Sequence, residues 1–215
     1  YGATEALPVA CISACEVLGE TAARTAEGGG VCVGRPWPGM EVKVISISDG
    51  PVAKWSEDLC LPAGETGEIV VKGPVVTAEY FGRAEATALA KMADPDGSTR
   101  HRMGDLGYFD EAGRLWFCGR KSHRVGVGAE TLYTIPCEGV FNRHPAVRRS
   151  ALVGVENGAG KLPVLCVELE PGSDQDKVRR DLLQTARDFA HTRRITTVLF
   201  HPAFPVDVRH NAKIF

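Results

Sequence analysis

The chain has 215 residues, enough for one large domain or two small ones, and its net charge of −2 gives no basic field for nucleic acid or an anionic membrane. Aromatic residues make up only 7% of the sequence and offer no platform for stacking bases, so we expect no nucleic-acid partner. No apolar run reaches the roughly 18 residues that span a bilayer, and the seven cysteines form no Cys-x-x-Cys pair. We therefore expect a cytoplasmic protein with reduced thiols and no membrane span.

The first half of the chain predicts short strands between Gly-rich turns. Residues 1–40 are rich in Gly and Pro and suggest irregular structure, with a loop and short helix at 6–18. β-Branched residues then predict strands at 42–47, 68–72 and 114–118, with one or two helical turns at 87–92. The run Gly104-Asp105-Leu106-Gly107-Tyr108 reads as a tight turn bounded by glycines. This pattern predicts a small barrel or a distorted sheet.

The pattern changes after Arg120, where helices and longer strands alternate. A helix is predicted from Thr134, with this threonine as its N-cap, to about residue 143. Strands follow at 147–155, 162–169 and 195–200, and a helix capped by Ser173 or Asp174 runs to His191. The predicted fold class is α+β, with a domain of residues 1–120 and a small α+β domain of residues 121–215.

Three segments carry residue types suited to binding a nucleotide. The chain begins Tyr1-Gly2-Ala3-Thr4-Glu5, which offers an aromatic face, a neutral donor and a hard carboxylate, although such a pentapeptide also suits a turn capped by threonine. Asp105 could accept both hydrogen bonds of a vicinal diol, and Arg120 presents a permanent cation to an anionic oxygen. A lone Gly-Asp is otherwise a common surface turn.

The last segment is Asn211-Ala212-Lys213-Ile214. Together these segments resemble the adenylate-forming superfamily of acyl-CoA synthetases, peptide-synthetase adenylation domains and luciferases. The resemblance implies that Tyr1 stacks on adenine, Thr4 contacts the α-phosphate, and Glu5 holds Mg²⁺. The resemblance also implies that Gly2, in the same segment, belongs to the nucleotide-binding site.

The resemblance also assigns roles to the residues that follow. It implies that Asp105 binds the ribose hydroxyls, that Arg120 binds ribose or phosphate oxygen, and that Lys213 is catalytic, stabilising charge at the α-phosphate. Lys121 and Ser122 fall at the hinge between the large and small domains. Residues 1–120 would then be the C-terminal part of the large domain, a barrel-like sheet included, and 121–215 the small mobile domain.

One segment differs from the usual pattern of the superfamily, and this difference narrows the expected function. Thioester-forming members usually carry an Ile-Lys-x-x-Gly pattern after the hinge arginine, whereas this chain has Val125-Gly126-Val127-Gly128-Ala129-Glu130 without the lysine. The segments 119–125, 133–138 and 204–214 resemble instead a branch that makes β-lactones in bacterial long-chain olefin biosynthesis. The alternative is a long-chain fatty acyl-CoA ligase or fatty acyl-AMP ligase.

The β-lactone branch implies a complete reaction. ATP with Mg²⁺ would activate a long-chain β-hydroxy acid as acyl-AMP, and the β-hydroxyl would then close the ring and release AMP. The substrate is a small molecule, and other enzymes of olefin biosynthesis are left open as partners. His123 and His210 are open candidates for the proton acceptor, each also compatible with a structural role.

We expect the chain to be the C-terminal portion of a larger enzyme, because both ends fall within motifs of the family. By itself it is expected neither to activate acids nor to bind ATP tightly. A non-catalytic docking role for the chain alone is the remaining alternative.

Overall fold

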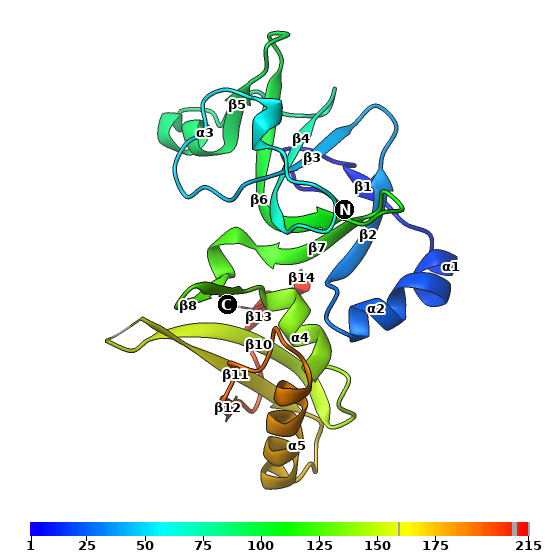
Figure 1. Ribbon diagram of the computed structural model, residues 1–215, viewed down its shortest axis with the longest axis vertical. Helices are drawn as coiled ribbons and strands as arrows, with labels where there is room; N and C mark the ends of the chain where they lie inside the picture. Colours follow the sequence, from blue (N-terminus) through cyan, green and yellow to red (C-terminus); the bar gives the residue numbers. More distant parts are fainter. Residues whose placement is uncertain (159, 208–209, 215) are drawn as a thin grey trace. The chain divides into compact units, whose positions relative to one another are not determined.

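A computed structural model describes residues 1–158, 160–207 and 210–214, with side chains as far as residue 207. Backbone contacts divide the chain into two compact units (Figure 1). The first comprises residues 1–22 and 30–122, and the second comprises residues 23–29 and 123–215. Assigning these units to the large and small domains of adenylate-forming enzymes stays a prediction.

The first unit is built on an antiparallel sheet in the order β1-β2-β7-β6-β4-β3, with β5 also paired to β6. Its strands are β1 (Ala10–Cys11), β2 (Val31–Pro36), β3 (Glu41–Ile45), β4 (Gly67–Lys72), β5 (Lys91–Ala93), β6 (Thr99–Phe109) and β7 (Leu115–Arg120). Three of these strands, β3, β4 and β7, were predicted from their β-branched or apolar runs. The irregular structure expected over residues 1–40 is wrong at β2, which pairs with β7.

The expected tight turn at 104–108 is wrong, because these residues lie inside the long strand β6. Their glycines serve a β-bulge: Gly104 has φ of +65°, and the register with β7 shifts between Leu106 and Gly107. A Cβ on Gly107 would lie 2.3 Å from the carbonyl oxygen of Trp116. A bulge and a turn use glycine for the same backbone freedom, so the sequence alone did not separate them.

Short helices complete the first unit. They are α1 (Ala14–Glu16), a π-helical turn (Val17–Thr21), the start of α2 (Ala22–Ala26), a 3₁₀ turn (Glu57–Leu59) and α3 (Ala84–Ala90). Ser13 and Glu16 form a capping box at the start of α1, which fixes the short helix that was expected in this region. The helical turns expected at 87–92 are found over residues 87–90, the end of α3, and the prediction is wrong at residues 91–92, which begin β5.

The second unit holds a three-stranded sheet in the order β10-β11-β12. Its elements are β8 (Val125–Val127), β9 (Glu130–Leu132), α4 (Thr134–Phe141), β10 (Val147–Glu156), β11 (Lys161–Leu169), α5 (Gln175–Asp188), β12 (Thr197–Phe200), β13 (Val206–Asp207) and β14 (His210–Ile214). Because β12 runs parallel to β11, the chain must cross the sheet between them, and α5 is that crossover. The observed mixture of strands and helices confirms the α+β class.

Helix α5 forms where the N-cap residue and the periodic apolar residues predicted it. The Asp174 side chain accepts hydrogen bonds from the N–H groups of Asp176 and Lys177, and Val178, Leu182 and Ala186 recur on the buried face. The helix ends at Asp188, three residues before the predicted end. At α4 the predicted cap is wrong: Tyr133 is the N-cap, without a side-chain hydrogen bond, and Thr134 is the first helical residue.

Candidate functional site

Two of the predicted nucleotide-binding residues face each other across neighbouring strands. The pairing of β6 with β7 sets Asp105 opposite Arg120. Arg120 Nη1 donates to Asp105 Oδ1 at 2.8 Å and to the Met103 carbonyl at 3.2 Å. The Tyr1 hydroxyl donates to the other carboxylate oxygen, Oδ2, at 2.6 Å. A carboxylate is thus held between a phenol and a guanidinium that come from distant parts of the sequence.

Burial shifts the pKa values of Asp105 and Tyr1. It raises the pKa of the Asp105 carboxyl, while the Tyr1 hydroxyl and the Arg120 guanidinium oppose that rise. Burial also raises the pKa of Tyr1, and the neighbouring Asp105 charge adds to the effect, so the phenol stays a donor. The Arg120 side chain is 54% exposed and the Asp105 side chain 8% exposed. The arginine is therefore the member of the pair that solvent reaches most easily.

Glu5, the predicted Mg²⁺ ligand, is held by a tyrosine that the sequence did not single out. The Tyr80 hydroxyl donates to Glu5 Oε1 at 2.7 Å, and the Thr77 N–H donates to the Glu5 carbonyl at 2.9 Å. The bond from Tyr80 lowers the pKa of Glu5, which keeps this carboxylate ionised at neutral pH. Burial and the Glu5 contact raise the pKa of Tyr80 to about 12.

A cavity of about 370 Å³ lies in the first unit and brings several of these groups together. Glu5, Tyr80, His101, Gly104 and Arg120 are among the residues that line it. Burial, and next the charge of Lys91, lowers the pKa of His101 to about 4, so this imidazole is neutral at physiological pH. The cavity therefore presents a carboxylate and a guanidinium, which suits a ligand that carries both phosphate and a metal ion.

A second cluster of charges forms another part of the cavity wall. We call Glu68, Arg102 and Lys121 the Glu68 cluster; all three line the cavity. The Glu68 carboxylate accepts from Arg102 and from Lys121, and both Glu68 and Arg102 have side chains only 1% exposed. Sequence reasoning missed Glu68 and Arg102. For Glu68 the available signal was a carboxylate that opens the apolar run of β4 and therefore needs a buried partner, whereas Arg102 lies in a polar part of β6 and carried no such signal.

The remaining predicted residues are placed as follows. Thr4 is exposed, and Gly2 is packed so tightly that a Cβ would lie 2.6 Å from Leu7 Cδ1. Lys121 and Ser122 lie in a 3₁₀ turn, Lys121–His123, at the end of the first unit. The backbone of Lys213 lies in β14, paired with β13, and its side chain falls outside the described structure. The structure thus assembles Tyr1, Glu5, Asp105 and Arg120, and leaves the role of Lys213 a prediction.

Within residues 1–158, 160–207 and 210–214 there is no group of three or more His, Cys, Asp or Glu side chains that could hold a metal ion. Glu5 fits Mg²⁺ in another way, as a single ionised carboxylate lining a cavity. Mg²⁺ keeps several waters and is commonly bound by one or two carboxylates together with substrate phosphates. Over the same described residues, no helix combines the length and apolar character needed to cross a bilayer.

Comparison with known proteins identifies the class. Residues 1–81 match the family model described as AMP-binding enzyme. The o-succinylbenzoate CoA synthetase of Bacillus subtilis, solved in complex with its acyl-adenylate intermediate, superposes with a TM-score of 0.74 and 25% identity, covering 100% of this chain and 39% of that one. The amide bond synthetase of Marinactinospora thermotolerans gives a TM-score of 0.67 and 30% identity over 81% of this chain and 33% of that one. The chain is thus similar to adenylate-forming enzymes, as its motifs predicted.

Two relatives are similar over the whole chain. The olefin beta-lactone synthetase of Xanthomonas campestris is 50% identical over 221 aligned residues, and that of Stenotrophomonas maltophilia is 51% identical over 219. Each alignment covers 100% of this chain and 40% of the relative. The chain therefore spans about two fifths of the length of these curated relatives.

Proposed function

We propose that the enzyme containing this chain activates a long-chain β-hydroxy acid with ATP and closes it to a β-lactone. The observation that carries the proposal is the hold on Asp105 by Tyr1 and Arg120 beside a cavity lined by Glu5, in a chain half identical to olefin beta-lactone synthetases. The two units would be the C-terminal part of the large domain and the small mobile domain of such an enzyme.

The first step requires a nucleotide held in one orientation. In our proposal Tyr1 stacks on adenine, Gly2 and Thr4 border the phosphates, and Asp105 accepts the ribose hydroxyls while Arg120 donates to an oxygen of the same nucleotide. An oxygen of the substrate carboxylate then attacks the α-phosphorus, and pyrophosphate leaves. Lys213 donates to the charge that develops there. Glu5 would hold Mg²⁺, which would supply positive charge beside the phosphates.

In the second step the β-hydroxyl oxygen attacks the acyl carbon and AMP leaves with the former carboxylate oxygen. The hydroxyl proton passes to solvent as the ring closes. A tethered nucleophile needs no second substrate, since tethering supplies a high effective concentration. This agrees with the segment 125–130, which lacks the lysine of thioester-forming members and folds as the hairpin β8–β9.

The setting of the reaction is also a proposal. All seven cysteines are free in the described structure, which supports a reducing compartment such as the cytoplasm. Other enzymes of olefin biosynthesis would supply the β-hydroxy acid and consume the lactone. The alternative function is a long-chain acyl-CoA or acyl-AMP ligase, favoured by similarity to CoA ligases such as the 2-succinylbenzoate–CoA ligase of Geobacillus kaustophilus, 40% identical over 53% of this chain and 22% of that ligase.

The full-length enzyme with MgATP and no CoA separates these functions. AMP release and extracted products are compared for a long-chain 3-hydroxy acid and for the same acid without the hydroxyl. Turnover with the hydroxy acid alone, giving a lactone, supports the proposal. Stalled adenylation of both acids, relieved by CoA, would establish an acyl-CoA ligase instead.

A further inference from the structure

Arg120 lies at a strand end, where both its backbone and its side chain need contacts to stay ordered. This residue is the last of β7, and its side chain is 54% exposed. Strand ends are places where backbone order is lost first, and a long exposed side chain has many rotamers. Asp105 and the Met103 carbonyl hold the guanidinium, but neither contact holds the backbone that follows Arg120.

The next residue, Lys121, anchors the backbone at this point. Its Nζ donates to Glu68 Oε1 at 2.8 Å and to the Ser48 carbonyl at 2.8 Å. The Lys121 side chain is 18% exposed, and that of Glu68 is 1% exposed. A hydrogen bond between charged groups is stronger than one between neutral groups, and water screens this one little.

Glu68 itself is fixed by Arg102. Arg102 Nη2 and Nε donate to Glu68 Oε2 at 2.6 and 3.2 Å. Arg102 also donates to the carbonyls of Ser48, Gly50 and Leu89. The lysine therefore binds a carboxylate that is already immobile, at a point where β4, β6 and the loop around residues 48–50 meet.

We infer that Lys121 is a positioning residue for Arg120. Asp105 holds the arginine's side chain, and Lys121, through the Glu68 cluster, holds the backbone on its C-terminal side. The guanidinium is then presented to the cavity before ATP arrives, so that less ordering is required on binding. At the predicted hinge, Lys121 is the residue that the Glu68 cluster holds. The functional half of this inference rests on the proposed function.

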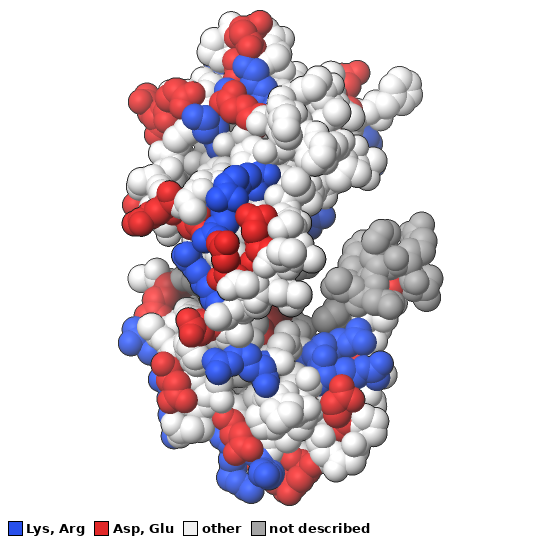
Figure 2. Space-filling model, turned by 90° about the vertical axis from the view of Figure 1, so that its right-hand side faces the viewer, with Lys and Arg blue, Asp and Glu red and all other residues white. Residues whose placement is uncertain are grey.

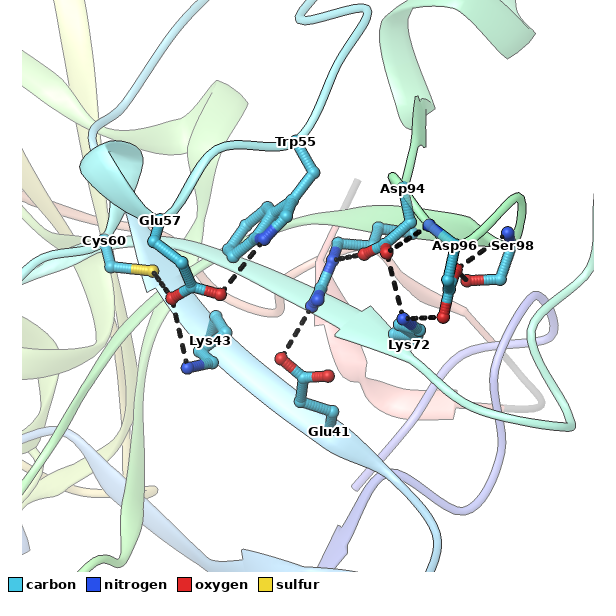
Figure 3. A network of polar contacts seen from close by, with 10 residues as sticks. Glu41, Lys43, Trp55, Glu57, Cys60, Lys72, Asp94, Asp96 and Ser98 are labelled. Carbon is cyan, nitrogen blue, oxygen red and sulfur yellow. Dashed lines mark hydrogen bonds and ion pairs between the residues drawn. The ribbon is translucent and has the colours of Figure 1, made fainter.

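The test uses the full-length enzyme with Lys121→Met, which keeps the length of the side chain and removes its charge. Glu68 keeps Arg102 as a partner, so the variant leaves no buried carboxylate unpaired. Lys121→Arg is the conservative variant. The matched control is Lys72→Met: Lys72 is 21% exposed, contacts Asp94 and Asp96 in the same unit, and does not line the cavity (Figure 3).

Two readouts are compared. Amide hydrogen exchange of residues 119–122 is expected to accelerate about tenfold in Lys121→Met, and KM for ATP to rise about threefold to tenfold while KM for the acid stays unchanged. Lys121→Arg should restore both, and Lys72→Met should change neither.

The following results would contradict the inference or separate it from the proposed function. Unchanged exchange in Lys121→Met would overturn the backbone hold. Faster exchange with an unchanged KM for ATP would overturn the positioning role. If the wild-type enzyme does not use ATP, the proposed function fails, and the exchange measurement, which needs no substrate, still decides whether Lys121 holds the strand end.

Discussion

Asp105→Asn should separate binding from stability, because Asp105 is a buried carboxylate that folding does not favour in its charged form. Its pKa is raised by burial, so the folded state holds the proton more tightly than the unfolded state does. Stability contributed by this group is therefore lost as the pH rises from the unfolded pKa through the folded pKa. Asparagine keeps the shape of the side chain and removes the free-energy cost of burying a charged carboxylate.

The expected magnitudes follow from the contacts. The ion pair with Arg120, whose side chain is 54% exposed, contributes at most about 1 kcal/mol, so the stability of Asp105→Asn should lie within about 1 kcal/mol of wild type. Hydrogen bonds to a charged group contribute about 1.5–3 kcal/mol and neutral ones about 0.5–1.5. Replacing two charged bonds to a ribose diol by neutral ones should cost about 2–3 kcal/mol, or ATP binding weakened roughly 30- to 150-fold.

Asp110→Asn is the matched control. Asp110 is equally buried and accepts from Arg114 Nε and Trp116 Nε1, each at 2.9 Å. There the hydrogen bonds outweigh burial and lower its pKa, so the charged form stabilises the fold. Calorimetric titration of the full-length enzyme with ATP, with thermal unfolding, should show opposite patterns: Asp105→Asn loses affinity and Asp110→Asn loses stability. Asp105→Asn binding ATP within about threefold of wild type would refute the assignment.

Three further predictions concern other groups. Lys213→Ala should lower the rate of ATP–pyrophosphate exchange by about 100- to 1,000-fold, with substrate binding little changed; a loss below about tenfold would remove Lys213 from catalysis. Tyr80→Phe should raise the Mg²⁺ concentration for half-maximal activity about threefold, because Glu5 loses its donor; an Mg²⁺ titration that superposes on wild type would contradict this. Burial raises the pKa of Glu138 to about 7, so Tm should fall as the pH rises through about 5 to 7, and Glu138→Gln should flatten that slope, whereas equal slopes would show that Glu138 does not titrate there.

Local sequence signals predicted much of the fold. The β-branched run of β4 and the capped, periodic α5 were visible because each depends on its own segment. Strand β2 was missed because Gly34 and Pro36 follow its short Val31–Val33 run and have poor strand propensity, which pairing with β1 and β7 overrides. Strand β6 was missed because a bulge places its glycines where a turn was expected.

The site was predictable only where a motif marked it. Tyr1, Glu5, Asp105 and Arg120 were named from their motifs, and the structure brings them around one region of the first unit. Tyr80 and the buried partners in the Glu68 cluster carried no motif, because their role depends on pairing between strands distant in the sequence.

Composition gave only the net charge of −2, from which we expected no global basic field. On the face drawn in Figure 2, basic and acidic residues of the described part are interspersed. Such a mixture creates no extended field of one sign on that face.

The central claim is that the acid, not the alcohol, is activated. The full-length enzyme is given a 3-hydroxy acid whose two carboxylate oxygens are ¹⁸O, with MgATP, and both products are analysed by mass spectrometry. Activation of the carboxylate predicts one ¹⁸O in AMP and one in the lactone, because the ring oxygen comes from the unlabelled hydroxyl. AMP without label and a lactone with both labelled oxygens would show that the hydroxyl was the activated group, and would contradict the account.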